Sequence, residues 1–76
     1  MSTSPETVSL EIGRKLRARR KALGMTLAQV AARCGVSLQL IHKYETAASV
    51  ISAPMLWRLS RCLGSPISYF FDELGE

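Results

Sequence analysis

The sequence predicts an all-α protein of five helices, and three observations support this prediction. Apolar residues recur at intervals of three and four positions, several segments begin at a serine or threonine and stop at a glycine, and no segment alternates polar and apolar residues as a strand does. A chain of 76 residues that is 47% hydrophobic can build one modest core. We therefore expect one helical domain.

The first predicted helix runs from about Val8 to Leu23 and ends at Gly24, which can adopt the left-handed conformation of a helix stop. Arg20 lies on the inward stripe of this helix, whereas the other basic residues point elsewhere. The small polar residues 1–7 predict a flexible N-terminal tail, which leaves residues 8–76 for the domain. The inward apolar residues are Ile12, Leu16 and Leu23.

Two short helices joined by a tight turn are predicted next. Thr26 and Gln29 have the spacing of a capping box, so a helix should follow them and run to Cys34, with Val30, Ala31 and Cys34 buried. The turn is Gly35-Val36-Ser37, where glycine can take a positive φ and serine can cap the next helix, residues 38–46. This arrangement is the sequence form of a helix-turn-helix.

The last part of the chain predicts a loop and two more helices. Residues 47–51 are the loop, and Ser52-Ala-Pro54 starts a helix that stops at Gly64. Ser65-Pro66 then caps a short helix over residues 67–73. The apolar residues expected to face the core are Met55, Leu56, Leu59, Cys62 and Leu63, with Ile67, Phe70 and Phe71 closing it.

Positive charge is concentrated in the first helix. The net charge is +4, and six of the ten basic residues lie within positions 14–21. Such a run is typical either of a solvated helix face or of a surface that binds a polyanion or an anionic membrane.

Other function classes find little support. Cys34 and Cys62 belong to no metal-binding or disulfide pattern and are expected to be small buried apolar residues, so no metal or cofactor is expected. One histidine without an acidic cluster does not make an active site, so we expect no enzyme and no small-molecule substrate. The chain has neither a signal sequence nor a membrane-spanning stretch, which predicts a cytoplasmic protein with reduced thiols.

Several segments, in this order and spacing, carry a resemblance: Ile12-Gly-Arg-Lys-Leu-Arg-Ala-Arg-Arg20, Leu23-Gly-Met-Thr-Leu-Ala-Gln-Val-Ala31, Gly35-Val-Ser37, Ile41, Tyr44-Glu45 and Leu63-Gly-Ser-Pro-Ile-Ser-Tyr-Phe-Phe71. Together they resemble the Cro and C1 repressor type of helix-turn-helix domain, the XRE family, over residues 8–73. The resemblance implies a five-helix, lambda-repressor-like fold whose third helix enters the major groove of DNA.

The third predicted helix would carry the base contacts. With Ile41 and Tyr44 as its buried face, steps of 100° per residue leave an outward side of Gln39, Lys43, Thr46 and, toward one edge, His42. A glutamine can bond N6 and N7 of adenine, a lysine can donate to guanine, and an apolar side chain can touch a thymine methyl. The resemblance likewise implies base contacts at Leu38, Gln39 and Lys43, and we add His42.

A guanidinium on an apolar stripe needs a partner, because burial of an unpaired charge is costly. Glu45, near the inward face of the third helix, is the expected partner of Arg20, and the resemblance implies the same ion pair. The expected phosphate contacts are Arg14, Arg17, Arg19, Arg33, Thr26, Ser37 and Thr46. The chain departs from the family pattern at Leu27, where a phosphate-contacting glutamine is common. It also departs in the loop after the third helix, where the family usually has a glycine and then often asparagine or a basic residue facing phosphate, and this chain has Ala47, Ser49 and Val50.

These features predict a sequence-specific regulator of transcription, with repression the expected role, bound as a homodimer to a near-palindromic operator in double-stranded DNA. A small interface would make the dimer weak off DNA. The resemblance implies self-contact at Ser65, Pro66 and Ile67, and Trp57 and residues 69–71 are expected extensions. The alternative is a protein-interaction module, such as an antitoxin or the antagonist of a regulator, which the altered loop favours.

Overall fold

A computed structural model describes residues 3–74 of the chain. Its elements are α1 (Pro5–Ala22), α2 (Leu27–Cys34), α3 (Leu38–Glu45), α4 (Ala53–Leu63) and the 3₁₀ helix η1 (Ile67–Phe71), and the described residues contain no strand. The predicted all-α class is confirmed. The fifth helix differs from the prediction, since it is a single 3₁₀ segment that ends at Phe71 instead of an α-helix to Glu73.

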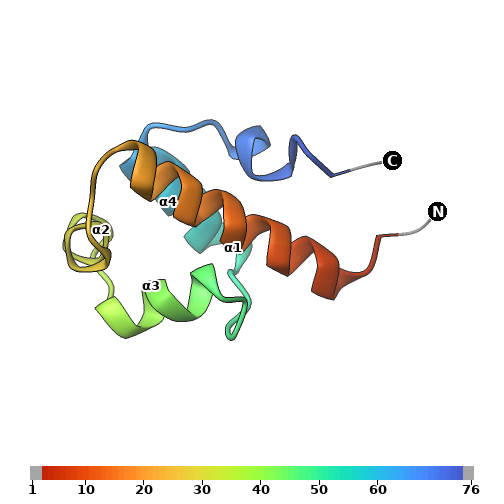
Figure 1. Cartoon of the computed structure of the whole chain (residues 1–76), viewed down its shortest axis with the longest axis horizontal. Helices are drawn as coiled ribbons and strands as arrows, with labels where there is room; N and C mark the ends of the chain where they lie inside the picture. Colours follow the sequence, from red (N-terminus) through yellow and green to blue (C-terminus); the bar gives the residue numbers. More distant parts are fainter. Residues whose placement is uncertain (1–2, 75–76) are drawn as a thin grey trace.

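The long helix α1 is the centre of the arrangement (Figure 1). The α2–α3 pair lies along one side of it, α4 lies behind, and η1 packs against the other side. Both ends of the described chain lie at the same end of the molecule, far from the turn between α2 and α3 (Figure 1). The side of α3 that points away from α1 is not covered by another of these elements (Figure 1).

The core joins all five elements. Its fully buried side chains come from each of them: Leu16, Val30, Ile41, Leu59, Leu63 and Phe70. Each such side chain contributes about 1.5–3 kcal/mol by leaving water. Of the predicted core, Ile12, Met55, Cys62 and Phe71 are partly buried and pack against the buried cluster, and two residues lie at the surface. Leu23 lies in the turn beyond the last residue of α1 and is 39% exposed, and Ile67 lies at the surface end of η1 and is 38% exposed.

The first helix begins earlier than the apolar stripe suggested. Ser4 is its N-cap and accepts a hydrogen bond from the backbone N–H of Thr7, and Pro5 occupies the first turn. Serine followed by proline is a strong start signal, because the ring presets φ and its missing N–H is not needed there. The expected start at Val8 was therefore wrong by three residues, and residues 5–7 are helical instead of part of a tail.

The helix-turn-helix is built as the sequence predicts. Thr26 and Gln29 form the capping box, with bonds of 3.1 Å and 2.8 Å between the side chain of each and the backbone N–H of the other. Gly35 adopts a left-handed φ of 73°, and Ser37 caps α3 by accepting from the N–H of Leu40. The helix α3 ends at Glu45, one residue before the expected Thr46, which is the C-cap.

At Gly13 the backbones of α1 and α3 come together. A Cβ atom at this position would lie 2.5 Å from the carbonyl oxygen of Tyr44 and 2.7 Å from that of Glu45. Real Cβ atoms do not approach oxygens so closely, and a backbone carbonyl at the end of a helix cannot turn aside as a flexible side chain can. Glycine at residue 13 therefore sets the distance between α1 and the end of α3.

Gly13→Ala should destabilise the fold by about 3 kcal/mol, because the added methyl group forces α1 and α3 apart and disturbs the core between them. Gly24→Ala is the control, since its Cβ would meet nothing within 4 Å and only the positive φ is strained, at a cost of about 1 kcal/mol. Urea unfolding of both variants measures the difference. Equal losses would show that the contact between α1 and α3 is not tight.

Candidate nucleic-acid interface

The outer face of α3 carries the residues predicted to contact bases. Gln39, His42 and Lys43 are exposed, and Leu38 at the start of the helix is 41% exposed. The opposite face is buried through Ile41 and Tyr44, as the 100° step per residue predicted. The four side chains thus lie at the surface of one helix, free to meet a partner along the uncovered side of the molecule (Figure 1).

An ion pair holds the end of α3 against α1. The guanidinium of Arg20 donates to both carboxylate oxygens of Glu45, at 2.6 Å and 3.0 Å, and its third nitrogen donates to the carbonyl of Met25 at 3.1 Å. The two side chains are only 13% and 4% exposed. The hydrogen bond to Glu45 raises the pKa of Arg20, against the opposing effect of burial. The predicted pair is therefore present, and both of its side chains are largely buried.

The caps of α2 and α3 leave hydroxyl protons available. Thr26 and Ser37 each use the hydroxyl oxygen to accept a backbone N–H at 3.1 Å. Each O–H therefore stays free to donate, which is what a phosphate oxygen requires. Thr46 differs, because its hydroxyl donates to the carbonyls of His42 and Lys43 at 3.1 Å and 3.3 Å. As a phosphate donor Thr46 would first have to break these bonds.

The arginines of α1 point in different directions. Arg17 lines a hollow together with His42 and Thr46, on the α3 side of the molecule. Arg19 projects about 200° away from Arg17 around the helix. It donates to the carbonyl of Leu63 at 2.9 Å, so it caps the end of α4. The structure does not bring Arg19 together with α3, contrary to the expected phosphate contact.

Two further basic residues are paired with acids. Arg14 contacts Glu11 at 2.9 Å and Glu73 at 2.6 Å, and both carboxylates raise its pKa. Lys15 lies 2.9 Å from Asp72 and is only 8% exposed. These contacts tie the C-terminal residues to α1 and reduce the charge available to a polyanion. No sequence signal distinguishes Lys15 from its neighbours, so its structural role was not predicted.

The remaining arginine of the expected phosphate set is Arg33. It is exposed near the end of α2, and its nearest polar contact is the sulfur of Met25 at 3.8 Å. It forms no ion pair among residues 3–74.

A helix-turn-helix family model matches residues 16–70 of the chain. The chain belongs to the helix-turn-helix family. A protein of Rhodospirillum rubrum, named as an uncharacterized transcriptional regulator in the ATPase CF(0) region, is 42% identical over 88% of this chain and 62% of its own length. An HTH-type transcriptional regulator of Sinorhizobium medicae is 32% identical over 91% of this chain and 50% of its own length. The expected XRE-type membership is confirmed.

The same helix-turn-helix fold occurs in a solved structure. A transcriptional regulator from Vibrio cholerae matches 93% of this chain and 40% of its own chain, with a TM-score of 0.86 and 25% identity. This chain thus spans about half of the length of its curated relatives. The names of these proteins point to regulation of transcription and away from catalysis. Within residues 3–74, no helix is long and apolar enough to cross a membrane.

The loop after α3 departs from the family pattern, and the backbone at this departure is strained. Ala47 adopts a φ of 62°, the left-handed region that the family's usual glycine enters without strain. The backbone N–H of Ala48 donates to the carbonyl of Lys43 at 2.8 Å and closes the turn. Val50 then stands 77% exposed beside α1.

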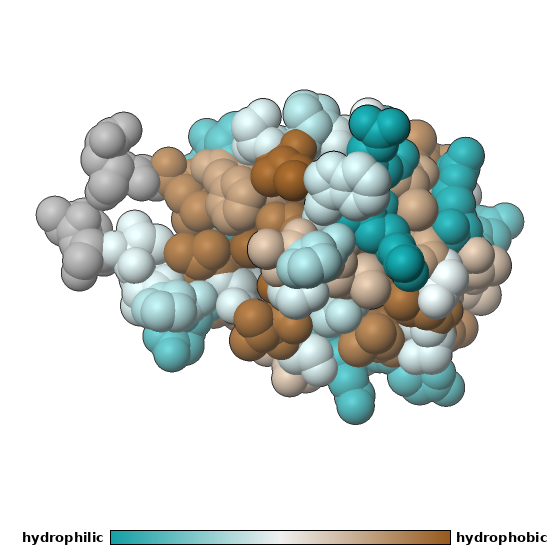
Figure 2. All heavy atoms as spheres, turned by 180° about the vertical axis from the view of Figure 1, so that it is seen from behind, coloured by the Kyte–Doolittle hydropathy of each residue, from teal (hydrophilic) through white to brown (hydrophobic). Residues whose placement is uncertain are grey.

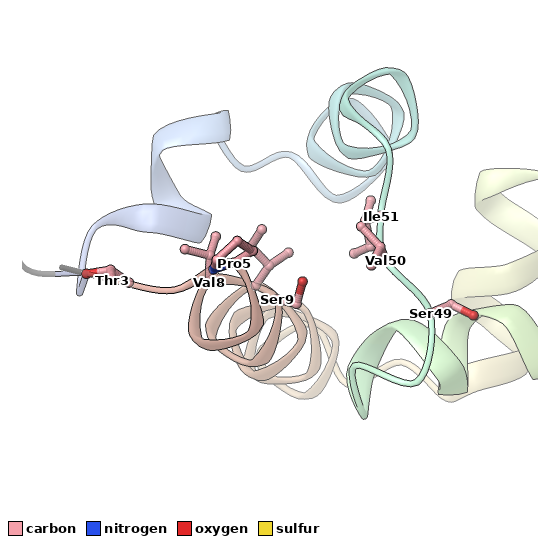
Figure 3. A pocket seen from close by; sticks show the side chains of 8 residues that line it. Thr3, Pro5, Val8, Ser9, Ser49, Val50 and Ile51 are labelled. Carbon is pink, nitrogen blue, oxygen red and sulfur yellow. The ribbon is translucent and has the colours of Figure 1, made fainter.

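An apolar hollow lies between this loop and the start of α1 (Figure 3). Its volume is about 360 Å³, and Val50 and Ile51 of the loop face Pro5 and Val8 of α1 across it, with Ile12 of α1 also in its lining. Val50 also borders a second hollow that includes Leu10, which is itself 60% exposed. Val8 and Ile51, which are 43 positions apart in the chain, both line this hollow. The sequence did not predict this surface.

The expected self-contact surface is only partly exposed. Trp57 is 58% exposed, and the guanidinium of Arg61 lies over its ring at 5.6 Å. Ser65, Pro66 and Ile67 line a hollow beside Trp57, but Ser65 is only 8% exposed and Phe70 is fully buried. Ser65 and Phe70 therefore offer little surface for the expected self-contact. Seen from behind, hydrophobic side chains form a band that runs from the end with the chain termini toward the middle of this face (Figure 2).

Glu45→Ala should destabilise the fold by about 3–5 kcal/mol, because it leaves the guanidinium of Arg20 buried without a carboxylate. Arg14→Ala is the control, since the ion pairs of Arg14 are at the surface, where solvent screens them, and its loss of stability should be much smaller. Thermal and urea unfolding measure both. Losses of the same size would contradict the assignment of Glu45 to a buried pair.

Ala47→Gly should stabilise the fold by about 0.5–1 kcal/mol. The strain of alanine at a positive φ is removed, and this strain is larger than the additional chain entropy that glycine loses on folding. Ala48→Gly next to it has no positive φ to relieve and should be neutral or destabilising. The midpoints of urea unfolding measure the two changes. A lower midpoint for Ala47→Gly would be the contrary result.

Proposed function

We propose that this chain binds double-stranded DNA in a sequence-specific way and regulates transcription, with α3 in the major groove and repression as its role. The single observation that carries the proposal is the state of α3. One face is held against α1 by Arg20 and Glu45, and the other presents Gln39, His42 and Lys43 to solvent. A rigid helix with polar side chains along its free side matches the depth and chemistry of a major groove.

Each exposed side chain of α3 has a suitable base. Gln39 can bond N6 and N7 of adenine, and Lys43 can donate to O6 or N7 of guanine. Leu38 at the start of the helix can touch the methyl group of thymine. His42 lies on the same exposed face, toward Arg17, and serves either a base or the adjacent sugar-phosphate chain.

Phosphate contacts come from both sides of α3. The hydroxyl groups of Thr26 and Ser37 donate from the N-termini of α2 and α3, where the backbone N–H groups also favour an anion. Arg17 donates from α1, and Arg33 adds a further charge. Leu27 and Val50 supply no donor at positions where the family often has one. We therefore expect modest affinity and a shallow dependence on salt.

The working unit is a homodimer on a near-palindromic operator. One module of this size covers too little DNA to distinguish an operator from other genomic sites. Trp57, Pro66 and Ile67 are the exposed apolar residues available for self-contact on the side away from α3. This small patch favours a monomer in dilute solution that dimerises on DNA. A bound dimer would repress by occupying the operator.

The apolar hollow favours a second candidate function, binding of a protein partner. Val50 and Leu10 are large apolar residues at the surface, next to the end of α3. A partner seated there would lie against the DNA-binding side and block it. In that case the chain would act as an antitoxin or as the antagonist of a regulator. Selection from a pool of random DNA duplexes would then yield no preferred sequence.

Lys43→Ala should lose about 1–3 kcal/mol of discrimination at one base pair, because its ammonium group reads a guanine. Arg17→Ala should instead weaken binding to all duplexes alike and reduce the salt dependence, as expected of a phosphate contact. Binding of both variants to the operator selected from a random duplex pool, and to a scrambled duplex, measures the difference. Equal losses on both duplexes for Lys43→Ala would assign it to phosphate.

Two half-sites should be recognised together when their centres lie about 10–10.5 base pairs apart, because this spacing puts both recognition helices on one side of the duplex. Duplexes with one half-site, two at this spacing, and two at half that spacing are compared by titration. Cooperative binding is expected only on the second. If one half-site gives full affinity, or the half-turn duplex binds as well, the symmetric dimer is wrong.

A further inference from the structure

One side of α1 carries an exposed row of side chains that the proposed DNA contacts use only in part. Its members are Leu10, Arg14, Arg17 and Lys21, which lie within about 60° of one another around the helix. We call this row the outer stripe, and all four of its residues are exposed. Arg14, Arg17 and Lys21 border one shallow hollow with Ala18. The outer stripe therefore begins with an apolar residue and continues as a basic surface.

The loop after α3 adds a second apolar residue beside Leu10. Val50 is 77% exposed and Leu10 is 60% exposed, and both line a hollow of about 390 Å³ together with Ala47. Val50 leaves the loop on the side that faces the start of α1 (Figure 3). Two large apolar side chains exposed in one hollow favour contact with another protein. Neither of them can donate a hydrogen bond to a phosphate of DNA.

The charges along the outer stripe indicate the chemistry of that protein. Arg17 and Lys21 lie about 10.5 Å and about 16.5 Å beyond Leu10 along the helix axis. They form no ion pair among residues 3–74. Glu6 lines the same hollow as Leu10 and lies one turn before it. This pattern complements a segment whose carboxylates all lie on one side of its apolar residue.

Carboxylates of the chain itself already bind one end of the basic surface. Glu73 lies 2.6 Å from the guanidinium of Arg14, and Glu11 lies 2.9 Å from it. The outer stripe thus accepts a carboxylate from a distant segment of the chain. Arg17 and Lys21 have no such partner in the described part of the chain, so they are available to carboxylates of another protein.

We propose that the hollow and the outer stripe together bind an acidic segment of a partner protein. An apolar side chain of the segment is seated between Leu10 and Val50, and its Asp or Glu side chains pair with Arg17 and Lys21. Glu6 disfavours the reverse orientation by repulsion between like charges. Burial of the apolar side chain supplies most of the affinity, because each ion pair at an exposed surface contributes little.

Binding of this segment excludes DNA, because Arg17 cannot hold a carboxylate and a phosphate of the duplex at once. Arg17 also lines a hollow with His42 and Thr46, so the segment would lie beside the end of α3. The partner would thereby release the chain from its operator. The proposal specifies the partner of the second candidate function, and its regulatory effect rests on the proposed DNA binding.

Selection from a random library of short peptides displayed on phage, against the immobilised full chain, tests the binding without DNA. The enriched peptides should combine a large apolar residue with Asp or Glu on one side of it. Fluorescence anisotropy of one labelled peptide then measures the affinity. Val50→Ser and Leu10→Ser should each weaken binding about tenfold, because the apolar contact is lost. Arg17→Ala should weaken it about threefold. Trp57→Ser is the matched control, since Trp57 is 58% exposed in a different hollow and should leave the affinity unchanged.

Three results would overturn the proposal, namely no enriched peptide, enrichment of basic peptides, or equal affinity of Val50→Ser and the unaltered chain. The same holds if Val50→Ser weakens binding to the selected operator as much as binding to the peptide, because the surface then belongs to DNA. Competition is measured separately, by adding the peptide to the chain bound to its operator. Simultaneous binding overturns only the exclusion of DNA. If the chain selects no duplex, the proposed DNA binding fails and the peptide contact stands.

Discussion

The attachment of α3 to α1 fixes the position of the helix that carries the proposed base contacts. Gly13 allows the two backbones to touch, and the guanidinium of Arg20 binds both oxygens of Glu45 beside that contact. A bulkier residue at position 13 would open a gap between the two helices. Loss of either partner of the ion pair would leave the other charge buried without a counter-ion. With both in place, the outward face of α3 is determined down to individual side chains. The proposed base contacts therefore depend on residues that touch no base.

The distribution of charge follows from the same packing. Six basic residues crowd into positions 14–21, yet they do not form one basic surface. Arg20 is buried in its pair, Arg19 caps α4, and Lys15 holds the C-terminal residues through Asp72. Arg14 is paired at the surface with Glu11 and Glu73. Arg17 and Lys21, which form no ion pair among residues 3–74, are the charges left for a polyanion.

The helix caps link stability to the proposed function. Thr26 and Ser37 each satisfy a backbone N–H at the start of a helix, and the same hydroxyl groups keep a proton to donate. Two of the proposed phosphate contacts thus come from groups that the fold already needs. The end of α3 has the opposite character, because Ala47 stores strain there and the hydroxyl of Thr46 is used internally. The loop that follows exposes Val50 and borders an apolar hollow.

Features that depend on neighbouring residues along the chain could be predicted from local patterns. The capping box of Thr26 and Gln29, the turn at Gly35, and the face of α3 marked by Ile41 and Tyr44 are local patterns of spacing and residue type. Even the pairing of Arg20 with Glu45 follows from a charge on an apolar stripe together with a family resemblance. The start of α1 differs from the expected Val8 because Ser4 and Pro5 form a local start signal ahead of the apolar stripe.

Contacts between groups from distant segments follow from the packing of the helices and could not be predicted from local patterns. The roles of Lys15 and Arg19 and the burial of Ser65 depend on how α4 and the C-terminal residues lie against α1. Helical periodicity states which side a residue faces, but not which element covers that side. That choice is made by the packing of the whole core, and every residue in the core takes part in it.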